Sequence, residues 1–177
     1  MTTIERKRSR ARFWLGYFAA WLGLGLWLGL NVIIGHRNSG SGIAPWEPLT
    51  WELSSVVLMS VLAIAVFHVE RRFPLSGSDA LRRLPLHLAA ALVFSLLHTC
   101  GMVAIRQVVY AAHASVYRFG DWRLGLAYEF QKDLISYAAI IGFCIAWRAV
   151  RARRERELTM IRLERDLGQA RLAQLTA

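Results

Sequence analysis

Four long apolar runs, separated by polar segments, dominate the pattern of the chain. They cover residues 13–35, 51–69, 85–105 and 131–150. A helix rises about 1.5 Å per residue, so about 20 apolar residues cross the hydrocarbon core of a bilayer. Each run is close to that length. The pattern therefore predicts an all-α fold, an integral membrane four-helix bundle that occupies residues 13–150.

The first run must be distinguished from a secretory signal peptide, because a basic segment precedes it. That segment, residues 1–12, carries five Lys or Arg side chains. The run is too long for the apolar part of a signal peptide, and no clean cleavage site follows it. We therefore interpret residues 1–12 as a basic cytoplasmic N-terminus. Within the run, Gly25 and Gly29 have the spacing that allows close helix approach, although Gly is common in membrane helices in general.

Basic residues are unevenly distributed among the segments that flank the runs. Residues 1–12 hold five, the connector 70–84 holds four, and the stretch from Arg148 onward holds eight. The 36–50 loop holds one, and the longer 106–133 stretch balances four with three acids. Because Lys and Arg accumulate in cytoplasmic segments, both termini are predicted to be cytoplasmic.

The tail of the chain, residues 151–177, is polar, has no Pro and is rich in Arg and Leu. Apolar residues upstream of the fourth run predict one helix from about Leu124 through the span into this tail. Met160, Leu163, Leu167 and Ala170 follow the a and d spacing of a coiled coil, and Leu172 and Leu175 continue after a register shift near Gly168. Too few heptads are present to decide between a two-helix stalk and a helix lying on anionic lipid.

Composition agrees with a membrane protein, since 55% of the residues are hydrophobic and seven are Trp. The net charge of +10 raises the question of nucleic-acid binding. However, the Arg residues lie beside the apolar runs, as topology signals do, so no direct nucleic-acid partner is expected. No catalytic triad, phosphate-binding loop or zinc motif is present.

Several polar residues are predicted to share one level near the outer face of the membrane. They are Asn31, Glu47, Glu52, Arg106, Glu129, Lys132 and Asp133. On a continuous helix Glu129, Asp133 and Tyr137 share a face. Two carboxylates on one face repel unless a cation, a proton or an Arg lies between them, and Arg106 is the candidate partner. The group is either a site that receives a stimulus or an interfacial anchor with a structural ion pair.

Histidines offer a different site. His68 ends the second span and His87 begins the third, so a haem or a metal ion bridging them is a possible alternative. His98 lies about 16 Å farther along the helix. No further ligand pattern supports such a site, and we expect no metal ion or cofactor in the chain.

The end of the chain resembles the linker of LytS/YehU-type bacterial sensor histidine kinases. That linker follows the pattern LE-x-x-L-x-x-A-R-L-x-x-L and leads into a PHFLFN box with the phospho-accepting His. Matching residues here are Leu163, Glu164, Leu167, Ala170, Arg171, Leu172 and Leu175. The match covers about the last 20 residues. The sequence ends a few residues before the box would begin, so no catalytic residue of the family has a matching position.

The resemblance implies the transmembrane signal-input region of a two-component sensor histidine kinase in the bacterial inner membrane. ATP and Mg²⁺ would bind only a kinase domain outside these residues, and a response regulator would be contacted only through such a domain. A homodimer through the C-terminal helix is expected, besides contact with membrane lipid. The residues expected to transmit the signal are Met160, Leu163, Leu167, Gly168 and Ala170.

Two other functions remain open at this stage. One is a stand-alone membrane carrier or haem/redox protein, which would use the outer polar group or the His68 and His87 pair. The other is the membrane anchor of a LytTR-type transcription regulator.

Overall fold

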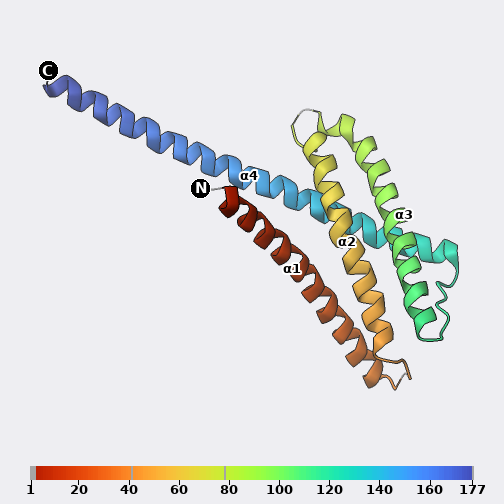
Figure 1. The fold of residues 1–177 in the computed structure, drawn as a ribbon. Helices are drawn as coiled ribbons and strands as arrows, with labels where there is room; N and C mark the ends of the chain where they lie inside the picture. The colour runs from red at the N-terminus through yellow and green to blue at the C-terminus, as the bar shows by residue number, and fades with distance from the viewer. Residues whose placement is uncertain (1–2, 41, 78, 177) are drawn as a thin grey trace.

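The fold consists of long α-helices joined by short connectors (Figure 1). The computed structural model describes residues 3–40, 42–77 and 79–176, and it contains no strand within them. The helices are α1 Thr3–Asn38, α2 Trp46–Arg72, α3 Ala80–Ala112 and α4 Trp122–Thr176. The all-α prediction is therefore confirmed.

All four helices are long and apolar enough to cross a membrane. Each predicted span lies inside one helix, but the helices are longer than the apolar runs. The third begins at Ala80, so the helix includes Pro85 after its first turn. The reason is that the polar residues flanking each run also form helix, and only the Gly- and Ser-containing connectors interrupt it.

Three helices form the centre of the molecule. Within the described residues α2, α3 and α4 contact one another, whereas α1 contacts only α2. Figure 1 shows α4 crossing α2 and α3 obliquely, with α1 beside α2. A buried apolar cluster joins the three central helices and consists of Val66, Ala91, Phe94, Tyr137 and Ile141. The bundle is thus a three-helix core with one peripheral helix.

The contact between α1 and α2 uses the two glycines with small-xxx-small spacing. A Cβ on Gly29 would lie 2.9 Å from Leu49, and a Cβ on Gly25 would lie 3.1 Å from Leu53. Tyr17 on α1 also donates a hydrogen bond to the Ser60 carbonyl oxygen at 2.6 Å. Close helix approach at this glycine pair is therefore a property of the fold.

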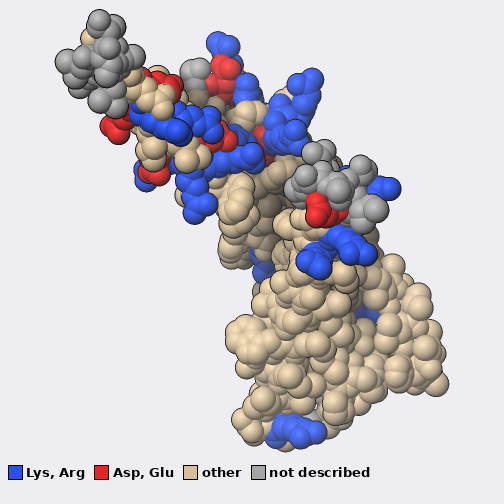
Figure 2. Space-filling view, turned by 60° about the vertical axis from the view of Figure 1, so that its left-hand side comes forward, with Lys and Arg blue, Asp and Glu red and all other residues tan. Residues whose placement is uncertain are grey.

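Most of the outer surface of the bundle is apolar. Figure 2 shows a broad uncharged surface, with Lys and Arg gathered mainly toward the end from which the tail projects. Large hydrophobic side chains point outward on every helix, among them Leu15, Trp27, Val61, Leu92 and Phe143. Such a surface suits hydrocarbon rather than water, because exposed apolar area on this scale is unfavourable in water.

The tail is the distal part of α4. It continues the helix without a break and extends beyond the other three helices (Figure 1). Arg148, at the point where α4 leaves the bundle, donates hydrogen bonds to Glu70 of α2 and to Ser76 of the α2–α3 connector. The bundle-forming part of α4 and the tail are therefore one continuous helix of 55 residues, about 80 Å long at 1.5 Å per residue.

Candidate functional site

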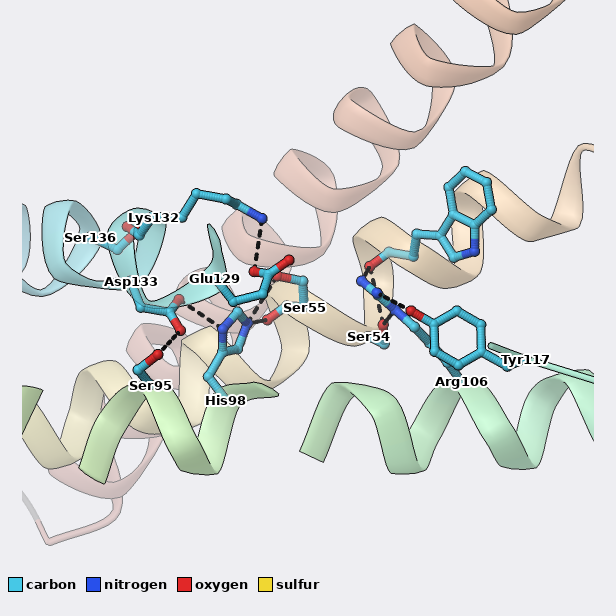
Figure 3. A network of polar contacts seen from close by, with 11 residues as sticks. Ser54, Ser55, Ser95, His98, Arg106, Tyr117, Glu129, Lys132, Asp133 and Ser136 are labelled. Carbon is cyan, nitrogen blue, oxygen red and sulfur yellow. Dashed lines mark hydrogen bonds and ion pairs between the residues drawn. The ribbon is translucent and has the colours of Figure 1, made fainter. Parts of the chain in front are cut away.

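Polar side chains meet inside the three-helix core, at a place that we call the buried polar centre. It consists of Ser55 of α2, Ser95 and His98 of α3, and Glu129 and Asp133 of α4 (Figure 3). Its members come from all three central helices. Any change in the relative positions of these helices would therefore alter the centre.

Helix periodicity explains why these residues converge. Glu129, Asp133 and Tyr137 are four residues apart on α4, and all three are buried. Ser95 and His98 are three residues apart on α3 and face the same neighbour. The sequence prediction that the α4 residues share one face is confirmed, and that face is turned inward.

Short polar contacts connect the members of the centre. His98 Nδ1 lies 2.8 Å from Asp133 Oδ1, and the other carboxylate oxygen of Asp133 accepts a hydrogen bond from Ser95 Oγ at 2.8 Å. His98 Nε2 lies 2.9 Å from Ser55 Oγ and 3.3 Å from the Ser55 carbonyl oxygen. Both side chains of the His–Asp pair are 1% exposed. The pair is thus enclosed, and each partner is oriented by a serine.

Electrostatics make this centre unusual for a protein interior. Glu129 and Asp133 are both buried, and isolated buried charge is strongly unfavourable. Lys132, whose side chain is half exposed, donates to Glu129 Oε2 at 2.9 Å and offsets one carboxylate. Within the described residues, the polar partners of Asp133 are Ser95 and His98. Its charge therefore requires a proton or a cation near His98.

The centre offers binding chemistry rather than covalent chemistry. Donor atoms of His98, Glu129 and Asp133 all lie within 4.8 Å of one another. An imidazole and two carboxylates are groups that take up protons or coordinate metal ions. Within the centre, Ser55 is hydrogen-bonded to His98 and Ser95 to Asp133, and these bonds orient the imidazole and the carboxylate.

Arg106 does not lie between Glu129 and Asp133, so this part of the sequence interpretation was wrong. Its guanidinium donates to Ser54 Oγ, the Tyr117 hydroxyl and the Trp51 carbonyl oxygen. On α3 Arg106 is eight residues from His98, about 12 Å along the helix. Figure 3 shows the two groups as separate clusters. The physical reason is that α4 crosses α3 obliquely. The carboxylates of α4 therefore lie beside Ser95 and His98, closer to the start of α3 than Arg106 is.

The remaining members of the predicted outer group are distributed around the start of α2. Glu47 accepts a hydrogen bond from the Tyr110 hydroxyl at 2.8 Å, and Trp51 Nε1 donates to the same hydroxyl. Asn31 is exposed and its amide donates to the Trp27 carbonyl oxygen of its own helix. Glu52 is half-buried on α2. The polar residues that were predicted to share one level therefore form two separate clusters, one around Arg106 and the start of α2 and one around Asp133 and His98.

The histidine pair considered from the sequence has other partners. His87 Nε2 lies 2.8 Å from the Phe73 carbonyl oxygen, which can only accept, so this nitrogen carries the proton. Its Nδ1 then accepts a hydrogen bond from the Tyr137 hydroxyl at 2.9 Å. His68 is exposed and bonds to the Ile64 carbonyl oxygen of its own helix. Both ring nitrogens of buried His87 are thus used within the protein.

Among the residues expected to transmit a signal, three present apolar side chains to the surroundings of the tail. Met160, Leu163 and Leu167 are all more than half exposed. A Cβ on Gly168 would meet no atom within 4 Å. The side chain of Ala170 lies outside the described part of the chain. The described apolar positions of the tail are therefore available for association.

Sequence reasoning missed the importance of His98, Ser55 and Ser95. The available signal was the spacing of Ser95 and His98 on one helical face within an apolar run. A second missed contact is the ion pair between Glu70 and Arg148, in which Glu70 is almost completely buried. Both features join helices that are distant in sequence.

No protein-family model, curated protein or solved structure matches this chain. Functional inference therefore rests on the residues and contacts of the chain itself.

Proposed function

We propose that the chain is the membrane-embedded signal-input region of a LytS/YehU-like two-component sensor histidine kinase. The observation that carries this proposal is the continuity of α4. One uninterrupted helix, Trp122–Thr176, contains two members of the buried polar centre near its beginning and the exposed apolar residues of the tail near its end.

The distribution of charge supports the topology expected for such a protein. The start of α1, the α2–α3 connector and the tail are rich in Lys and Arg, and Figure 2 shows these side chains mainly at the end from which the tail projects. Basic segments remain on the cytoplasmic side of the bacterial inner membrane. The distribution of charge thus supports a cytoplasmic location for both termini and the tail.

The proposed mechanism uses α4 as a rigid connector. A stimulus that changes the charge or occupancy of the buried polar centre changes how α4 packs against α2 and α3. Asp133 and Met160 are 27 residues apart on one helix, about 40 Å, so a rotation or tilt at the first is carried to the second. Such rigid-body motion is one of the established forms of switching.

The pair of Glu70 and Arg148 gives α4 a support where the tail begins. It ties α4 to α2 on the side of the bundle from which the tail projects. Helix α4 is thus held at two points, by Glu70 of α2 at Arg148 and by the buried polar centre at Asp133. With these two contacts we expect α4 to move as a rigid body rather than to bend.

The output step requires two copies of the chain. In the tail, an apolar stripe with coiled-coil spacing is formed by Met160, Leu163 and Leu167, each more than half exposed among the described residues. Association of two tails would bury this stripe, and a shift of register near Gly168 would change the relation of the two helices beyond it.

A chimera tests the proposal. The full chain is joined after Ala177 to the dimerisation and catalytic region of a LytS-type kinase, and autophosphorylation is measured in membrane vesicles. Combined Glu129→Gln and Asp133→Asn substitutions are expected to change the activity by about fivefold or more, since allosteric coupling of 1–3 kcal/mol has this effect. Asp79→Asn, on an exposed residue, is the matched control.

Equal activity of the wild-type and doubly substituted chimeras, with equal amounts of protein in the membrane, contradicts the proposal. In that case a stand-alone ion or proton carrier becomes the better assignment, because the buried polar centre also suits that function. A LytTR-type regulator shares the membrane part of the mechanism and differs only in the domain to which the tail connects.

A further inference from the structure

We infer that the buried polar centre binds one divalent first-row transition-metal ion. The ligands are His98 Nδ1 and one carboxylate oxygen from each of Glu129 and Asp133. The inference concerns binding alone, so it goes beyond the proposed function and does not depend on it.

The partners of the His98 ring provide the first support. Its Nε2 lies 2.9 Å from Ser55 Oγ, which can donate or accept, and 3.3 Å from the Ser55 carbonyl oxygen, which can only accept. A ring that carries its proton on Nε2 donates it to Ser55, and its Nδ1 lone pair is then free to bind a cation. Nδ1 lies 2.8 Å from a carboxylate oxygen of Asp133, so one cation can contact both atoms.

The geometry suits a metal ion as that cation. Nδ1 of this 1% exposed histidine makes no hydrogen bond within the described residues, although it lies 2.8 Å from Asp133 Oδ1. Two ligands of one metal ion need only point toward a common centre, not toward each other. Glu129 supplies a third donor, within 4.8 Å of a donor atom of each of His98 and Asp133.

The surrounding hydrogen bonds match those of metal sites. A metal-bound histidine usually donates its second ring nitrogen to an oxygen, and bound carboxylates are themselves hydrogen-bonded. Here His98 has Ser55 on its far side, and Asp133 has Ser95 on its second oxygen. These serines fix the ring and the carboxylate in the orientation that coordination requires.

Charge balance supports the same conclusion. Lys132 pairs with Glu129 on the more exposed side of the centre. Arg106 is bonded to Ser54, Tyr117 and Trp51, so it is not available to neutralise Asp133. A divalent cation bound by Glu129 and Asp133 would match their combined charge of −2, with Lys132 at the more exposed side of the centre adding +1.

The donor set determines the class of metal. One imidazole and two carboxylates suit Zn²⁺, Mn²⁺, Fe²⁺ or Co²⁺, whereas Cu⁺ prefers thiolate and Ca²⁺ needs six to eight oxygen ligands. Three protein ligands are also the usual number for zinc sites that keep one position open. We therefore use Zn²⁺ and Co²⁺ as probes.

Metal binding is tested on the full chain in lipid nanodiscs. The wild type is expected to retain one Zn²⁺ per chain after dialysis, and bound Co²⁺ is expected to give visible absorption bands that Zn²⁺ abolishes. His98→Gln and Asp133→Asn are expected to weaken Zn²⁺ binding at least tenfold. His68→Gln, on an exposed histidine, and Glu47→Gln, in the other polar cluster, are matched controls that keep wild-type affinity.

If His98→Gln does not fold, the Ser55→Ala and Ser95→Ala double variant replaces it. Loss of the two orienting hydrogen bonds is expected to weaken binding by about 10- to 100-fold. Absence of Zn²⁺ binding by the folded wild type overturns the inference and assigns a proton to the centre. Equal affinity of the wild type and the His98 or serine variants overturns it too. The inference and the proposed function can fail separately. If the chimera binds Zn²⁺ but its kinase activity is unchanged by Glu129→Gln and Asp133→Asn, the metal site stands and the proposed function does not.

Discussion

Glu70 and Arg148 form one ion pair, but their surroundings differ greatly. The Glu70 side chain is 1% exposed, whereas that of Arg148 is 44% exposed. Removing the arginine therefore leaves a buried carboxylate without a cation, while removing the carboxylate charge leaves an arginine that water can reach. The two halves of the pair are not equivalent for stability.

We expect Arg148→Ala to lower the free energy of unfolding by about 3 kcal/mol, the scale of an uncompensated buried charge. Glu70→Gln should cost about 1 kcal/mol, because only one hydrogen bond between neutral and charged groups is weakened. Thermal unfolding of the two variants in detergent measures the difference. Equal losses would show that the carboxylate is not buried in the folded protein.

The link between Tyr137 and His87 is a second residue-level feature. Tyr137→Phe removes the hydroxyl that donates to His87 Nδ1 and leaves this buried nitrogen unsatisfied. The expected loss is about 1–3 kcal/mol of unfolding free energy. Tyr128→Phe, on an exposed tyrosine of the same helix, is the control and should unfold like the wild type. An equal loss of unfolding free energy in Tyr128→Phe would show that the hydrogen bond between Tyr137 and His87 does not stabilise the fold.

Individual residues were only partly predictable. The spacing of Glu129, Asp133 and Tyr137 was sufficient to place them on one face, because helix geometry is fixed locally. The partners of that face were not predictable. A membrane helix is apolar on every side, so its sequence does not show which face is buried, and His98 therefore appeared no different from an interfacial histidine.

At the level of elements, helix length and apolar composition are strong local signals, and the four helices follow from them. Contacts between helices depend on small residues as well. A Cβ on Gly29 would meet Leu49, whereas a Cβ on Gly23 would meet nothing within 4 Å. The two glycines therefore form a matched pair for testing the α1–α2 contact.

Gly29→Leu is expected to destabilise the protein by about 1–3 kcal/mol, because overpacking a close contact forces the helices apart. Gly23→Leu has the same change in helix propensity but open space, and its stability should not fall. Thermal unfolding of both variants is the measurement. A loss of stability confined to Gly23→Leu would contradict the observed packing of α1 on α2.

The tail also has distinguishable faces. At 3.6 residues per turn Leu163 and Leu167 lie on the stripe with coiled-coil spacing, whereas Leu158 and Ile161 point away from it. Leu163→Gln with Leu167→Gln should weaken dimerisation more than tenfold, since each buried Leu contributes about 1.5–3 kcal/mol. Leu158→Gln with Ile161→Gln should leave the dimer intact. Fluorescence energy transfer between labelled chains in nanodiscs measures both, and the opposite ranking would assign association to the other face.

At the scale of the whole molecule, the peripheral place of α1 and the oblique path of α4 were not predictable from the sequence. Both depend on the sum of contacts between helices that are distant along the chain, among them the glycine contact of α1 and the polar contacts of α4. This oblique path separates Arg106 from Asp133. It also makes α4 the element that joins the buried polar centre to the tail.

We propose that α4 connects a membrane-spanning bundle to a tail through which two copies associate. The test of this proposal is the oligomeric state of the full chain in nanodiscs or detergent, measured by light scattering, beside a chain that lacks residues 151–177. We expect a dimer for the full chain and a monomer for the shortened one. Two monomers would contradict it, because the tail would then be a helix that lies on the lipid surface and transmits nothing between copies.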